Sequence, residues 1–224
     1  MRKFFLVSLG VLIFSACAGE PSKIIFRPES SGTLPGFRSW GRGRIQDYQD
    51  AALGGIIPEW LSRFLLQGNL GVEEMEIYRN SYVFVGINQG TNFKALGHWT
   101  EGFTAAQDFP RLAAVRIEER LLGAASLYPD DEYGEFFEAL VKNSSDAVYT
   151  GAIKESSFWI LRQYGENAAL AGERYDFFVL VTIAKSEFQA QVHAIMDGIR
   201  TNVPPTRDQA AAINRIKETF FDLF

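Results

Sequence analysis

The sequence predicts an α+β fold: a small antiparallel sheet with helices packed on one face, preceded by a signal peptide and a flexible tether. Residues 82–87 (YVFVGI) and 175–183 (YDFFVLVTI) are rich in β-branched and aromatic side chains, the composition of buried strands. A third such run, 157–164 (SFWILRQY), precedes the last by a loop containing Gly and Asn, which favours an antiparallel hairpin. Between these runs, apolar residues recur every three or four positions, the period of an α-helix.

Residues 1–16 have the pattern of a secretory signal peptide. Arg2 and Lys3 form a basic start, residues 4–14 form an apolar run too short to be a committed membrane span, and two small residues follow. The small residues and Cys17 resemble a bacterial lipobox. This resemblance implies cleavage before Cys17 and acylation of its sulfur and amino group. Two alternatives stay open: a secreted protein with a free thiol, and an uncleaved membrane anchor.

Charge and cysteine content narrow the classes of partner. The formal net charge is −5, and losing Arg2 and Lys3 with the signal peptide makes it −7. A negative balance argues against nucleic acid and against electrostatic docking on anionic lipid, so membrane attachment would depend on acyl chains on Cys17. The chain has one cysteine, so acylation of Cys17 leaves no thiol for a disulfide or a zinc site.

Residues 17–55 read as a lipidated Cys followed by a flexible tether. Pro and Gly recur through this segment with Ser between them, a composition that resists helix and strand. Trp40 lies among glycines and arginines, which makes it a candidate contact for lipid headgroups or peptidoglycan.

Residues 56–200 form the predicted α+β domain. A short amphipathic helix starts near Pro58, and Glu73 with its acidic neighbours is expected to form a solvated face. The strongest helix signal runs from 108 to 122. One face of that helix carries apolar residues at four-residue spacing: Phe109, Ala113, Ile117 and Leu121.

Further helices complete the domain in this interpretation. They are expected over 132–141, over 147–152 and from Ser186 to about residue 199. Residues 201–224 form a separate C-terminal amphipathic helix. Its apolar end, with Phe220, Phe221 and Phe224, either packs on the domain or binds a partner, so these residues are candidate interaction residues.

The sequence carries no recognised catalytic or metal-binding motif. His98 and His193 are far apart and lie in no metal-ligand spacing, and no nucleophile elbow or phosphate-binding loop is present. Asp130, Asp131 and Glu132 lack the alternation of a calcium loop. The sequence therefore predicts no catalytic residue, no metal and no cofactor.

Several residues together resemble the LPP-twenty type of bacterial lipoprotein, a family that includes the flagellar lipoprotein FlgP. The resemblance spans residues 57–192: a Pro58-Glu59-Trp60 entry, the strand at 82–87, an Ala-containing helix from Phe109 to Ile117, and the late strand at 175–183. It implies a small α+β domain with a helix packed on an antiparallel sheet, and no catalytic residues to carry over. This chain departs from the pattern in a longer insert at 89–106 and a longer C-terminal helix.

The expected function is that of a membrane-anchored bacterial envelope lipoprotein with a non-enzymatic structural or protein-interaction role. Its partners would be the membrane, through acyl chains on Cys17, and envelope proteins or further copies of itself. The outer membrane is favoured, because Ala18 and Gly19 lack the Asp often used for inner-membrane retention. The alternative is a lipoprotein that holds a lipid or small apolar ligand between helices and sheet, suggested by the 19 phenylalanines.

Overall fold

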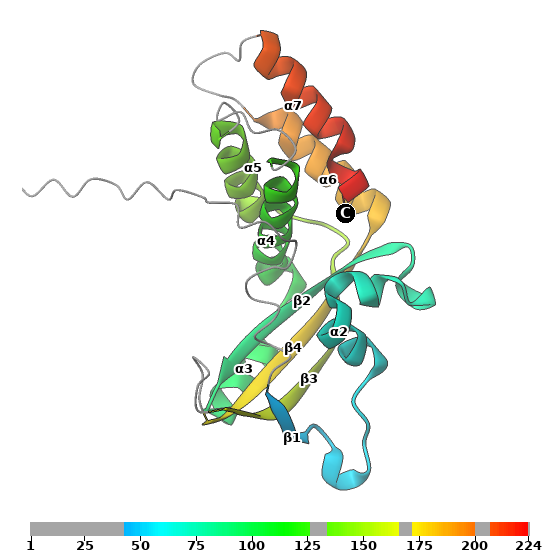
Figure 1. Cartoon of the computed structure of the whole chain (residues 1–224), viewed down its shortest axis with the longest axis vertical. Coiled ribbons are helices and arrows are strands. Elements are labelled where there is room, and N and C mark those ends of the chain that lie inside the picture. The colour runs from blue at the N-terminus through cyan, green and yellow to red at the C-terminus, as the bar shows by residue number, and fades with distance from the viewer. Residues whose placement is uncertain (1–42, 126–133, 166–171, 200–206, 224) are drawn as a thin grey trace, which may run out of the picture. The chain divides into compact units, whose positions relative to one another are not determined.

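The computed structural model describes residues 43–125, 134–165, 172–199 and 207–223 (Figure 1). These residues form a four-stranded antiparallel sheet with helices packed against it, so the predicted α+β class is confirmed. The strand order is β1-β3-β4-β2, which places β1 and β2 at the two edges.

The three predicted strands are present and longer than expected. They are β2 (Ser81–Gly90), β3 (Ile153–Tyr164) and β4 (Gly172–Ala184). β4 pairs with β3 on one side and with β2 on the other, and residues 176–183 of β4 are all buried. The hairpin expected between the second and third runs is confirmed by the antiparallel pairing of β3 with β4. A run that is apolar at consecutive positions is what a central strand covered on both faces requires.

The first strand lies inside the predicted tether. β1 (Arg44–Tyr48) pairs antiparallel with β3, and a short 3-10 turn (Ala51–Leu53) follows it. The prediction of a flexible spacer is therefore wrong from residue 44 onward, while residues before 43 lie outside the described part of the chain. β1 gave no strand signal because it is a mostly exposed edge strand with a bulge, so no apolar alternation marks it.

One face of the sheet is covered by α4 (Ala105–Ala125), α5 (Gly134–Asp146) and α6 (Lys185–Gly198). The stripe predicted for the helix at 108–122 is confirmed: Phe109, Ala113 and Ile117 are fully buried and Leu121 nearly so. The helix starts earlier than expected, since Thr104 precedes it and Asp108 accepts a hydrogen bond from the Thr104 backbone N–H at 2.8 Å.

The opposite face is covered by α2 (Glu59–Glu73), so the expectation that helices pack on one face only is corrected. Side chains alternate along β2, and Val83 contacts α2 while Tyr82 and Phe84 contact the other helix layer. Gly68 interrupts α2 with a φ of +73°, a backbone conformation that glycine adopts readily. A 3-10 turn (Glu76–Tyr78) then leads into β2.

One helix was not predicted, and one predicted helix is missing. The segment after β2 contains α3 (Phe93–Gly102), begun by Asn92, whose side chain accepts a hydrogen bond from the Ala95 N–H at 3.1 Å. The helix expected over 147–152 is absent: α5 ends at Asp146, and Gly151 has a φ of +77°. Lys154 then reaches from β3 to the end of α3 and donates to the carbonyl of Thr100 at 2.6 Å, where a cation is favoured by the helix dipole.

The C-terminal helix is confirmed as α7 (Arg207–Thr219), followed by a 3-10 turn (Phe220–Leu223). Lys217 of α7 forms an ion pair with Asp197 of α6 at 2.8 Å.

The connection from α5 to β3 offers a test of backbone geometry. A Cβ on Gly151 would collide with the carboxylate of Glu187, and its φ of +77° is strained for other residues. We expect Gly151→Ala to lower the free energy of unfolding by about 1–3 kcal/mol in urea titrations. Gly97→Ala is the matched control, because nothing surrounds that helical position, and it should stabilise by about 0.5–1 kcal/mol. Equal effects of the two variants would contradict the role assigned to Gly151.

Candidate functional site

The predicted lipidation site, Cys17, lies outside the described residues, and so do Trp40 and Phe224. The acylation of Cys17 and the contacts of Trp40 and Phe224 therefore stay predictions.

The other two candidate interaction residues belong to the packed domain. Phe220 is fully buried in the core formed with α4, α5 and α6, and Phe221 is half-buried against the same core. The Phe221 ring lies 4.9 Å from the ring of His193 on α6 and 5.0 Å from that of Phe220. Of the two alternatives for the C-terminal helix, packing on the domain is the one seen. Phe220 is thus unavailable as an exposed contact, because the sheet's helix layer already covers it.

A buried ion pair lies at the free edge of β2. Arg116, in the middle of α4, contacts Glu73, the last residue of α2, at 2.6 Å, and both side chains are almost fully buried. Glu73 also accepts a hydrogen bond from the Val83 N–H at 2.7 Å, and Arg116 donates to the Val83 carbonyl at 2.7 Å. The guanidinium lies over the rings of Tyr82 and Phe84, 5.2 and 5.1 Å from their centres. One ion pair therefore satisfies backbone groups that an edge strand leaves open.

Glu73 was expected on a solvated face, and that expectation is wrong. It is 8% exposed, and Arg116 is 3% exposed. Nothing in the local sequence separates Glu73 from Glu74 or Glu76, because the partner comes from a helix 43 residues away. A weak signal existed for Arg116: a charged residue within the apolar stretch of α4 needs a buried partner.

A second buried polar cluster joins three strands near the other end of β2. Asp176 of β4 forms an ion pair with Arg162 of β3, Nε to Oδ2 at 3.0 Å. Gln89 of β2 donates to Asp176 Oδ1 at 2.6 Å, and the Tyr164 hydroxyl donates to Oδ2 at 3.1 Å. Burial raises the pKa of Asp176, against the opposing influence of Gln89, Arg162 and Tyr164. Directly opposite Arg162 on β4 lies Arg174, whose Nε is buried and makes no hydrogen bond among the described residues.

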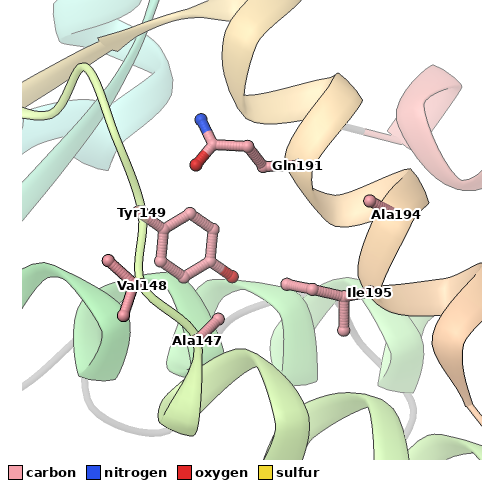
Figure 2. Close-up of a pocket in the computed structure, with 6 residues that line it drawn as sticks. All are labelled: Ala147, Val148, Tyr149, Gln191, Ala194 and Ile195. Atoms are coloured by element: carbon pink, nitrogen blue, oxygen red, sulfur yellow. The ribbon is translucent and has the colours of Figure 1, made fainter.

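A shallow groove of about 310 Å³ lies between the chain after α5 and helix α6 (Figure 2). It is lined by Ala147, Val148, Tyr149, Gln191, Ala194 and Ile195. The side chain of Gln191 is already hydrogen-bonded to the backbone of Thr150. The Gln191 side-chain oxygen accepts from the Thr150 N–H at 2.8 Å, and the Gln191 side-chain amide donates to the Thr150 carbonyl at 3.1 Å. The groove is therefore mainly apolar, with few polar groups left to orient a ligand.

Within the described ranges, no three or more His, Cys, Asp or Glu side chains lie together as a metal site would require. His98 is exposed on α3 beside Glu101, and His193 lies on α6 against Phe221. Among the described helices, none is both long and apolar enough to cross a membrane.

The phenylalanines that suggested a ligand site fill the space between helices and sheet themselves. Phe84 of β2 packs edge-to-face on Phe109 of α4 and on Phe188 of α6, with ring centres 4.7 and 5.3 Å apart. Tyr149 stacks on Phe188 at 5.8 Å. Aromatic pairs at these separations stabilise a core beyond the area they bury. These phenylalanines of the described residues therefore have a structural role in packing.

Comparisons of the chain with models of protein families, with curated proteins and with solved structures find no match. The resemblance to the LPP-twenty lipoproteins stays a prediction based on the residues quoted above.

Mutation of the Glu73–Arg116 ion pair should lower the free energy of unfolding strongly, and the effects of changing the two residues should not be additive. Arg116→Met leaves the Glu73 carboxylate buried without a cation, so we expect a loss of about 3–5 kcal/mol in the free energy of unfolding. Glu73→Gln combined with Arg116→Met should cost less than the sum of the single changes, as measured by a double-mutant cycle in urea. Arg63→Met is the control, because its pair with Glu59 is exposed on α2, and it should change stability by at most about 0.5 kcal/mol. Additive single changes would contradict the coupling.

Two buried tyrosines predict a loss of stability at alkaline pH. Burial raises the pKa of Tyr149 to about 12, with nearby Ser144 acting in the opposite direction, and burial with the Asp176 charge raises the pKa of Tyr164 to about 12. A phenol that holds its proton more tightly when folded stabilises the protein fully below its unfolded pKa of 10.0, and this contribution is lost as the pH rises towards 12.

We expect each Tyr→Phe variant to reduce that alkaline loss, measured by urea unfolding at a series of pH values. At neutral pH the two should differ. Tyr164→Phe removes the donor to Asp176 and should cost about 1–3 kcal/mol. Tyr149→Phe should cost less, because the Tyr149 hydroxyl lacks a well-formed hydrogen bond among the described residues. An unchanged alkaline profile in both variants would be the contrary result.

Proposed function

We propose that this protein is a lipid-anchored bacterial envelope lipoprotein whose domain acts through protein contact, without enzymatic activity. The observation that carries the proposal is the sequence of residues 1–17: a basic start, a short apolar run and small residues before the single cysteine, Cys17. Acyl chains on Cys17 would hold the domain at the membrane, because each buried methylene contributes about 0.8 kcal/mol and two or three chains act together.

The spacing between the anchor and the domain supports this function. Twenty-five residues separate Cys17 from Gly43, where the described part of the chain begins. A chain of this length spans at most roughly 90 Å when fully extended. The domain can therefore contact partners that lie within this distance of the membrane to which Cys17 is attached.

Exposed apolar side chains in and after α2 support a role in protein contact. Leu66 and Leu70, on either side of the kink at Gly68, are 81% and 49% exposed, and Ile77, in the turn that follows α2, is 73% exposed. Several large apolar side chains exposed within one short segment are candidates for an interaction site, whereas single exposed ones are ordinary. The buried charges, by contrast, contact one another and the backbone, which is a structural use.

The proposal is tested by the intact mass of protein extracted from membranes of the producing bacterium. We expect a mass that starts at Cys17 and carries two or three acyl chains. Cys17→Ala should remove the mass of the acyl chains.

A mass without lipid in the unsubstituted protein would overturn the anchored assignment. Ser15→Ala is a suitable control, because it keeps a small residue before the cysteine and should leave acylation unchanged.

A further inference from the structure

The chain enters the sheet at the end where β3 turns towards β4. Arg44, the first residue of β1, pairs with Gln163, and β3 ends one residue later, at Tyr164. At the opposite end of the sheet, β4 runs directly into α6 at Lys185 (Figure 1). An anchor that precedes β1 is therefore attached to the hairpin end of the sheet, with α6 starting from the far end.

Four aromatic side chains gather on the sheet between its middle and this hairpin end. Trp159 pairs with Phe177 across β3 and β4, Tyr175 lies two residues before Phe177, and Phe93 begins α3. The Phe93 ring contacts the rings of Tyr175, Trp159 and Phe177, with centres 5.0, 5.2 and 5.3 Å apart. We call these four residues the aromatic surface.

The aromatic surface is partly open to solvent. Phe93 is 41% exposed, and Trp159 and Tyr175 are half-buried, while Phe177 beneath them is buried. Most other large aromatic side chains of the described residues lie in the two cores. Trp and Tyr are favoured at the membrane–water interface, because each has an apolar ring and a polar group that can contact water.

One basic residue adjoins the aromatic surface. Lys94 follows Phe93 and is exposed. Arg174, although next to Tyr175 in the sequence, pairs with Arg162 and lies on the other face of the sheet. Phosphate oxygens of lipid headgroups accept hydrogen bonds from a lysine ammonium group. The protein's net negative charge means that the contact depends on the rings more than on charge.

We propose that the aromatic surface lies against the headgroup region of a phospholipid bilayer and turns the hairpin end of the sheet towards the membrane. The inference rests on the proposed lipid anchor. Cys17 keeps Gly43, where the described domain begins, within roughly 90 Å of the bilayer, so a contact that is weak in solution is favoured by the high effective concentration of the domain. The domain then stands on the membrane with α6 directed away from it.

The contact is tested without the lipid anchor, so that its failure is separate from failure of acylation. The protein is the chain from residue 17 onward carrying Cys17→Ala, mixed with phosphatidylcholine vesicles, and the partition coefficient is measured by sedimentation. We expect measurable partition, and Phe93→Ser should lower it about tenfold, because the substitution removes a partly exposed ring from the interface. Val148→Ser is the matched control: Val148 is 87% exposed beyond the opposite end of the sheet, and partition should be unchanged.

A second measurement identifies the ring that meets lipid. Brominated phosphatidylcholine should quench tryptophan fluorescence of the Cys17→Ala chain, and Trp159→Phe should remove most of that quenching, while Trp40→Phe should not. Thermal unfolding of each variant shows that the fold is kept.

Three results would overturn the proposal: no partition of the Cys17→Ala chain, equal partition of Phe93→Ser and Val148→Ser, or quenching that Trp40→Phe removes and Trp159→Phe leaves intact. Loss of a concentration-dependent dimer in Phe93→Ser, with partition unchanged, would assign the aromatic surface to a second copy of the chain instead. The mass of membrane-extracted protein separately reports whether Cys17 is acylated.

Discussion

The ion pair between Glu73 and Arg116 is the contact on which the arrangement of the domain depends. A sheet covered on both faces holds two helix layers that do not touch through the strands. This pair connects them around the free edge of β2, because Glu73 ends α2 on one face and Arg116 lies in α4 on the other. Both side chains also bond the backbone of Val83, so the two helices are held in register with one strand residue. Separating the two charges inside the protein would cost several kcal/mol, which makes this register the stable one.

The Asp176 cluster plays a similar part near the other end of β2. A carboxylate on the central strand gathers Gln89 from β2 and Arg162 and Tyr164 from β3, so three neighbouring strands share one buried acid. Both clusters place charged side chains at positions where an entirely apolar core would allow neighbouring strands or helices to shift relative to one another. The hairpin end, stabilised in this way, is also where β1 enters, and the aromatic surface lies between it and the middle of the sheet. The proposed anchor and the proposed lipid contact therefore share one end of the sheet.

Much of the fold was predictable because its strongest signals are local. The stripe of Phe109, Ala113, Ile117 and Leu121 has helical spacing, and the whole stripe is buried. The candidate site was less predictable. Phe220 was a candidate interaction residue, because the sequence pattern of an apolar helix end is the same whether that end packs on its own domain or binds another protein. Glu73 looked like its acidic neighbours, since only the folded chain brings Arg116 beside it.

By itself, the sequence determined the α+β class, the three long strands, the helix stripes and the pattern that predicts a lipid anchor at Cys17. Each of these depends on residues that are near one another along the chain. Only the tertiary structure decided that residues 44–48 form an edge strand, that α2 covers the second face of the sheet, and that Phe220 closes the core. These features depend on pairings between distant segments. An exposed edge strand such as β1 needs no apolar pattern of its own, because its backbone hydrogen bonds to β3 are what hold it in place.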